Sequence, residues 1–183
     1  RRVSSAGQPV RSCLRFARPS FTKRLSWLLV LFAGLLLQVA PLSAALTVGR
    51  AIVDVTPRQL PVIKNGGFLE ASANRVVDPL FARCLVLDDG DRRIAIVVVD
   101  SCMIPRDLCD QIKQLASERS GIALSDMMIS ATHTHAAPSV MDYTLGSRAD
   151  PAYRAQLPQQ VAESIVRAAS NLQPAKVGFA RVD

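Results

Sequence analysis

The hydrophobic pattern beyond residue 45 predicts several strands and two helices. Apolar, β-branched stretches typical of strands lie at 46–55, 81–87, 93–99, 127–131 and 176–182. The acidic turn 88–91 contains a glycine and joins the second of these strands to the third as a tight hairpin. The third strand is apolar at successive positions, which is typical of a strand buried on both faces.

Two segments have the period of an amphipathic helix. In 105–120 the apolar residues recur every three or four positions, and Gly121 follows as a helix stop. A second pattern of this kind begins at Pro158, which suits a first turn, and ends near Asn171. Because a helix connects the strands 93–99 and 127–131, these strands are expected to pair in parallel. The sequence predicts an α/β fold with a mixed, largely parallel sheet and flanking helices.

Two stretches lack a sustained period and are predicted to be loops. They are 58–74, which contains Asn65-Gly66-Gly67, and 138–151. Long loops inside a domain often carry function, although a plain surface excursion explains 58–74 equally well.

The positive charge of the chain is concentrated in its first 45 residues. The net charge is +7, yet residues 1–45 hold seven of the 22 basic residues and no acidic one. The 15 basic residues that remain balance the 15 acidic ones, so the rest of the chain is formally neutral. A basic nucleic-acid-binding domain is therefore not expected.

Residues 1–45 have the pattern of an export signal. Lys23 and Arg24 precede the apolar run 25–39, and Ser43-Ala44-Ala45 supplies small residues for a cleavage site. The run of 15 residues is shorter than the roughly 20 that a spanning helix needs. We expect residues 1–45 to be a signal peptide, with retention as an N-terminal membrane anchor as the alternative. The protein would then be exported, either to a periplasm or outside the cell.

The two histidines of the chain, His133 and His135, follow directly after the predicted strand 127–131. Residues i and i+2 of an extended strand share a face, so both imidazoles are expected on one side. Neutral imidazole is a preferred ligand of zinc, and a catalytic zinc needs about three protein ligands. The spacing alone favours two interpretations: a metal site, or two loop histidines with ordinary hydrogen bonds.

Asp100 ends the strand 93–99, so the sheet is expected to place its carboxylate at the same edge as the histidines. It could orient an imidazole, or it could accept backbone hydrogen bonds in a turn. Ser101 lacks the sequence context of a hydrolase nucleophile. Cys84, Cys102 and Cys109 have no metal-finger spacing and are expected to be buried thiols, with a bond between Cys102 and Cys109 left open.

The order of these segments resembles the N-terminal catalytic domain of the neutral/alkaline, non-lysosomal ceramidase family, in a bacterial ceramidase-like branch. The matching segments, which together cover nearly all of residues 47–183, are 48–51, 54–57, 78–83, 97–100 and the block 129–135 with its Ser-Ala-Thr-His-Thr-His run. The resemblance implies that His133 is a zinc ligand and that His135 contacts substrate or the metal-bound water. It departs at 136–139, where this chain has Ala-Ala-Pro-Ser and the family usually has Ser-Gly-Pro-Gly.

The resemblance implies an exported, zinc-dependent amidohydrolase that cleaves the amide bond of an N-acyl sphingoid lipid. Residues 46–183 would form the N-terminal part of its catalytic domain, with the remaining metal ligands and the nucleophile beyond Asp183. Association with a membrane surface would agree with a lipid substrate. The alternatives are a lipid- or glycan-binding module with an incomplete metal site, and a metal hydrolase of another substrate class on the same scaffold.

Overall fold

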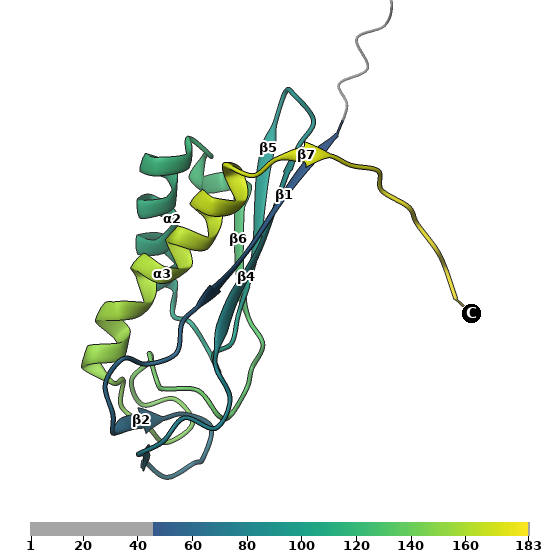
Figure 1. Cartoon of the computed structure of the whole chain (residues 1–183). Coiled ribbons are helices and arrows are strands. Elements are labelled where there is room, and N and C mark those ends of the chain that lie inside the picture. Colours follow the sequence, from purple (N-terminus) through teal and green to yellow (C-terminus); the bar gives the residue numbers. More distant parts are fainter. Residues whose placement is uncertain (1–45, 183) are drawn as a thin grey trace, which may run out of the picture. The chain divides into compact units, whose positions relative to one another are not determined.

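A computed structural model describes residues 46–182, and the leader predicted at 1–45 lies outside the described residues. The main sheet has the strand order β6-β5-β4-β1-β7. Its strands are β1 (Thr47–Asp54), β4 (Phe81–Asp88), β5 (Arg93–Val99), β6 (Met127–Ala131) and β7 (Gln173–Pro174). The helices are α2 (Arg106–Ser120) and α3 (Pro151–Ala169), with a short 3-10 turn at Leu124–Asp126. Figure 1 shows both helices on one face of the sheet.

The predicted α/β class and mixed sheet are confirmed, but most strand pairs are antiparallel. Within residues 46–182, only β5 and β6 pair in parallel, joined by α2, with Val97 opposite Ile129 and Val99 opposite Ala131. The pairs β1–β4, β4–β5 and β1–β7 are antiparallel. The chain returns antiparallel because the predicted hairpin joins β4 to β5 and no helix lies between β1 and β4.

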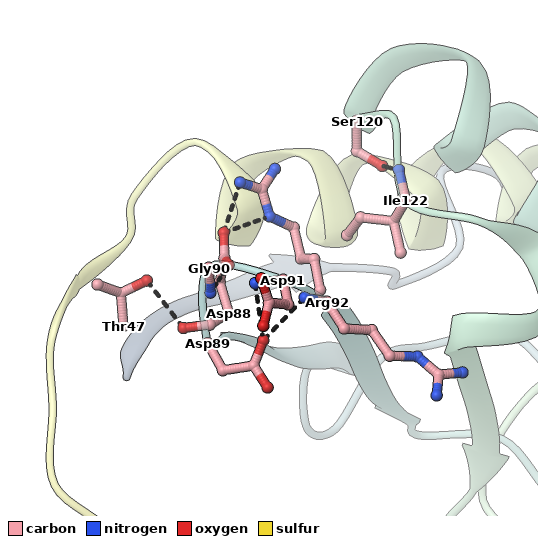
Figure 2. Close-up of polar contacts among 9 residues, drawn as sticks. Thr47, Asp88, Asp89, Gly90, Asp91, Arg92, Ser120 and Ile122 are labelled. Carbon is pink, nitrogen blue, oxygen red and sulfur yellow. Dashed lines mark hydrogen bonds and ion pairs between the residues drawn. The ribbon is translucent and has the colours of Figure 1, made fainter. Parts of the chain in front are cut away.

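The hairpin turn between β4 and β5 is stabilised by its own aspartates, as Figure 2 shows. The carboxylate of Asp88 accepts a hydrogen bond from the Gly90 amide at 2.9 Å. The carboxylate of Asp89 accepts from the amides of Asp91 and Arg92 at 3.1 and 2.8 Å. These bonds lower the pKa of both carboxyl groups, since they favour the ionised form. Asp88 and Asp89 therefore have a structural role in this turn.

Both helices pack their apolar faces on one side of the sheet. Leu108 and Ile112 of α2 join Val161 and Ile165 of α3 in one core with the inward residues of β4 and β5. The prediction that β5 is buried on both faces was wrong for the described residues. Its helix-facing residues are at most 1% exposed, whereas Val98, on the other face, is 36% exposed.

The start predicted for the second helix, at Pro158, was wrong by seven residues. Asp150 caps α3, its carboxylate accepting a hydrogen bond from the Tyr153 amide at 2.9 Å, and Pro151 occupies the first turn. Pro158 lies inside the helix and is buried. By contrast, α2 ends as predicted at Gly121, which has φ 74° and donates its amide proton to the Ser117 carbonyl.

Two other predicted segments differ from the structure. The loop 58–74 contains a small antiparallel hairpin of β2 (Val62–Lys64) and β3 (Ala71–Ala73). The strand expected at 176–182 is absent, and β7 is instead two residues paired with β1. Among residues 46–182, neither helix is long and apolar enough to cross a bilayer.

We predict that Asp150→Ala lowers the free energy of unfolding by about 2 kcal/mol. The carboxylate of Asp150 caps α3 and also accepts a hydrogen bond from the Ile63 amide at 3.0 Å, so its loss leaves two amides without that acceptor. Urea unfolding measures the change. Asp91→Ala is the control, because the exposed Asp91 carboxylate accepts none of the hydrogen bonds found between residues 46 and 182. Equal destabilisation by the two variants would contradict the prediction.

Candidate metal centre

The candidate site lies where the parallel strands β5 and β6 end at the same edge of the sheet. The ladder continues for one further bond, from the Thr132 amide to the Val99 carbonyl at 3.0 Å. Beyond that bond each of the two segments that follow the strands carries a candidate ligand. Cys102 follows β5 and His133 follows β6.

The backbone carbonyl of Cys102 orients the imidazole of His133. Nδ1 of His133 lies 2.8 Å from this oxygen. A carbonyl only accepts, so Nδ1 carries the proton in the neutral ring and Nε2 keeps its lone pair. A bond of this kind is how ligating histidines are commonly fixed, because it selects the tautomer whose other nitrogen faces the metal.

The spacing of His133 and His135 suggested that both lie on one extended strand, but the structure shows that they do not. Strand β6 ends at Ala131, and His133 has a left-handed backbone with φ 61°. Histidine is one of the residues that adopt this conformation more often than most, at a small cost in strain. The turn still brings the two rings together, with centroids 5.0 Å apart and planes at 75°.

Cys102, His133 and His135 each offer a ligand atom, and these atoms lie within 4.8 Å of one another. Two imidazoles and a thiolate form a donor set that suits zinc, which takes three protein ligands in catalytic sites. The residues therefore fit a metal of this type. The thiol of Cys102 is buried and lies 3.9 Å from Nδ1 of His133, and burial raises its pKa.

Sequence reasoning missed Cys102 as a member of this cluster. The signal that could have found it is its position just after β5, because the parallel pairing places that segment beside the residues that follow β6. Cys84 and Cys109 are also free thiols, as is Cys102. Burial raises the pKa of Cys84 to about 12, which agrees with the expected role of a small buried hydrophobe.

The carboxylate of Asp100 makes its hydrogen bonds away from both imidazoles. Its oxygens accept from Arg83 at 2.8 and 2.9 Å and from the Phe81 amide at 2.9 Å. Of the two roles considered for Asp100, its contacts agree with the acceptance of a backbone hydrogen bond, and the bond that orients His133 comes from the Cys102 carbonyl. Asp100 makes these bonds because it follows β5, and β4, which pairs with β5, places the donors Phe81 and Arg83 beside its carboxylate.

A cavity of about 430 Å³ opens beside His135. His135 and Asp100 both line it, together with the apolar side chains of Leu60, Val62, Val76, Val77 and Leu80. His133 lines a separate hollow with Cys102, Cys109 and Met141. The two imidazoles thus meet at the ring edge and face different spaces.

We predict that neutral His133 carries its proton on Nδ1, because a carbonyl oxygen faces that nitrogen. Long-range proton–nitrogen NMR correlations of the imidazole measure the tautomer. Cys102→Ala is the matched variant: it removes the thiol, keeps the carbonyl, and should leave the tautomer unchanged. A proton on Nε2 of His133 would show that the orienting bond is absent in solution.

The fold is similar to that of two solved ceramidase structures. A neutral ceramidase from Pseudomonas aeruginosa aligns with a TM-score of 0.63 over 72% of this chain, at 23% identity. A ceramidase complexed with C2 aligns with a TM-score of 0.60 over 72% of this chain, at 22% identity. The chain spans 22% of the length of each. The fold that the resemblance implies is thereby confirmed. No protein-family model and no curated protein matches the sequence.

Proposed function

We propose that residues 46–183 form the N-terminal part of the catalytic domain of a zinc-dependent, ceramidase-like amidohydrolase. The observation that carries the proposal is the convergence of Cys102, His133 and His135 at the edge of a sheet with a ceramidase-like fold. The orienting bond on Nδ1 of His133 adds support, since it presents Nε2 as a ligand.

The residues divide the work of such a site. His133 would hold the metal through Nε2, with the Cys102 carbonyl fixing the ring. His135, beside the cavity, would donate a hydrogen bond to the substrate or the attacking group, or accept one from it. A bound zinc would polarise the amide carbonyl and lower the pKa of the attacking group.

The proposed substrate is an N-acyl sphingoid lipid. The cavity beside His135 supports this proposal, because its apolar side chains suit a hydrocarbon chain near the imidazole. Lys64 and Arg75, also in the lining, would meet polar parts of the substrate. One of the matched proteins is a ceramidase complexed with C2, which agrees with this substrate class.

The proposed location is outside the cytoplasm. The basic residues, the apolar run 25–39 and the small residues at 43–45 support export through a signal. The same run would serve as a membrane anchor if it stays attached, which would keep the enzyme near a lipid substrate.

We predict that His133→Ala weakens zinc binding by at least ~100-fold, because it removes a ligand outright. Competition with a chromophoric chelator measures the affinity in the full chain. Cys109→Ala is the control, because Cys109 is a half-buried thiol outside the cluster, and it should bind zinc like the parent protein. Unchanged affinity in His133→Ala would overturn the assigned metal ligand.

Hydrolysis of a fluorescent N-acyl sphingosine by the complete protein tests the substrate. Zinc-dependent release of the fatty acid, lost in His133→Ala, is the expected result. Zinc binding without hydrolysis would overturn the lipid substrate and favour a metal hydrolase of another substrate class. Absence of both would favour a binding module.

A further inference from the structure

The imidazole of His135 packs directly on the backbone of Gly66. A Cβ atom added at Gly66 would lie 2.4 Å from Cγ, 2.6 Å from Cβ and 2.9 Å from Cα of His135. These separations are shorter than real contacts of a Cβ atom, so a side chain at position 66 cannot coexist with His135 in its observed place. Gly66 also has φ 94°, a conformation that favours glycine.

No hydrogen bond fixes the ring of His135 within the described part of the chain. Among the described residues, its ring meets that of His133 edge to face, with the ring centroids 5.0 Å apart. The side chain is exposed and its own loop is irregular. The contacts that the side chain of His135 makes are therefore packing contacts, with the ring of His133 and with the backbone of Gly66.

Asn65 joins the Gly66 segment to the segment that follows His135. Asn65 is 1% exposed, and its amide donates to the Ala137 carbonyl at 3.0 Å. Its side-chain Nδ2 donates to the hydroxyl of Ser139 at 3.1 Å, and its Oδ1 accepts from the Gly66 amide at 2.6 Å. The Ser139 amide in turn donates to the Ile63 carbonyl at 2.8 Å.

The side-chain bond between Asn65 and Ser139 is buried, so it is costly to break. A buried polar group that loses its partner has no water to replace it, and the bond therefore ties the two segments together. His135 lies on one of these segments and Gly66, against which it packs, lies on the other. The bonds between the segments therefore keep Gly66 next to His135.

We propose that Gly66 is a positioning residue for His135, held in place by the buried amide of Asn65. Gly66 provides the space in which the imidazole lies, and the bonds of Asn65 keep that space beside the metal cluster. The consequence for catalysis rests on the proposed function, whereas the packing of ring on glycine is independent of it.

A double-mutant cycle with Gly66→Ala and His135→Gly tests the packing. Gly121→Ala is the matched control: Gly121 also has a positive φ, of 74°, and a Cβ there meets nothing within 4 Å. We expect Gly66→Ala to lower the urea midpoint more than Gly121→Ala does. Much of this excess should disappear in the His135→Gly background, because Cγ and Cβ of His135, the two atoms nearest to an added Cβ, are then gone and the contact with Cα remains.

A second measurement follows the ring itself. In Gly66→Ala the imidazole NMR signals of His135 should shift, while His133 keeps its proton on Nδ1. If Gly66→Ala fails to fold, Asn65→Ala replaces it, since loss of the bond to Ser139 should also shift the His135 signals. Ser147→Ala is then the control, because Ser147 is equally buried and bonds the same hairpin at the Lys64 carbonyl, at 2.8 Å.

Two results would overturn the inference. One is an equal midpoint shift for Gly66→Ala and Gly121→Ala in both backgrounds; the other is unchanged His135 signals in Gly66→Ala or its replacement. Zinc titration of the parent protein separates this inference from the proposed function. Coupling without zinc binding would leave the packing intact and remove the zinc site, and zinc binding without coupling would do the reverse.

Discussion

The parallel pairing of β5 and β6 is the constraint on which the candidate site depends. Parallel strands end at the same edge, and the register here sets Val99 opposite Ala131. Cys102 and His133 lie three and two residues beyond these positions, so the register brings them together although they are 31 residues apart in the sequence. The bond from His133 to the Cys102 carbonyl follows from this register. A slip of one residue would turn each side chain to the other face of the sheet and separate the pair.

The second imidazole is placed by a different part of the fold. His135 lies beyond the end of β6, so strand pairing does not position it. The segment that follows His135 is instead bonded to residues of the β2–β3 hairpin. The buried bonds of Asn65 and Ser139 join the hairpin to the loop, and Asp150 joins the hairpin to the start of α3. Thus a strand register positions His133, while a loop network positions His135.

The interpretation of the metal centre depends on which ring nitrogen is free. The thiol of Cys102 lies near Nδ1 of His133, the nitrogen that already donates to the carbonyl. Nε2 is the nitrogen with an available lone pair, and a metal bound there has the carbonyl as its supporting outer contact. This arrangement is the one that the proposed zinc site requires, and the fold around it is similar to that of a solved neutral ceramidase.

The sequence by itself determined the elements that depend on local patterns: β1, β4, β5, β6 and α2, the acidic hairpin turn, and the two histidines after a strand. Period, turn residues and the glycine stop are local signals, so they can be read without neighbours. Tertiary structure decided the rest. The sheet is mostly antiparallel, which the sequence did not predict because the local pattern of a strand does not specify its partner or the direction of pairing. Helix α3 begins at Pro151 because Asp150 caps it there, and the helix accommodates Pro158 in a buried position. Asp100 bonds to β4, and Cys102 meets His133, because strand order places them side by side, a relation that spans more than 15 residues in each case.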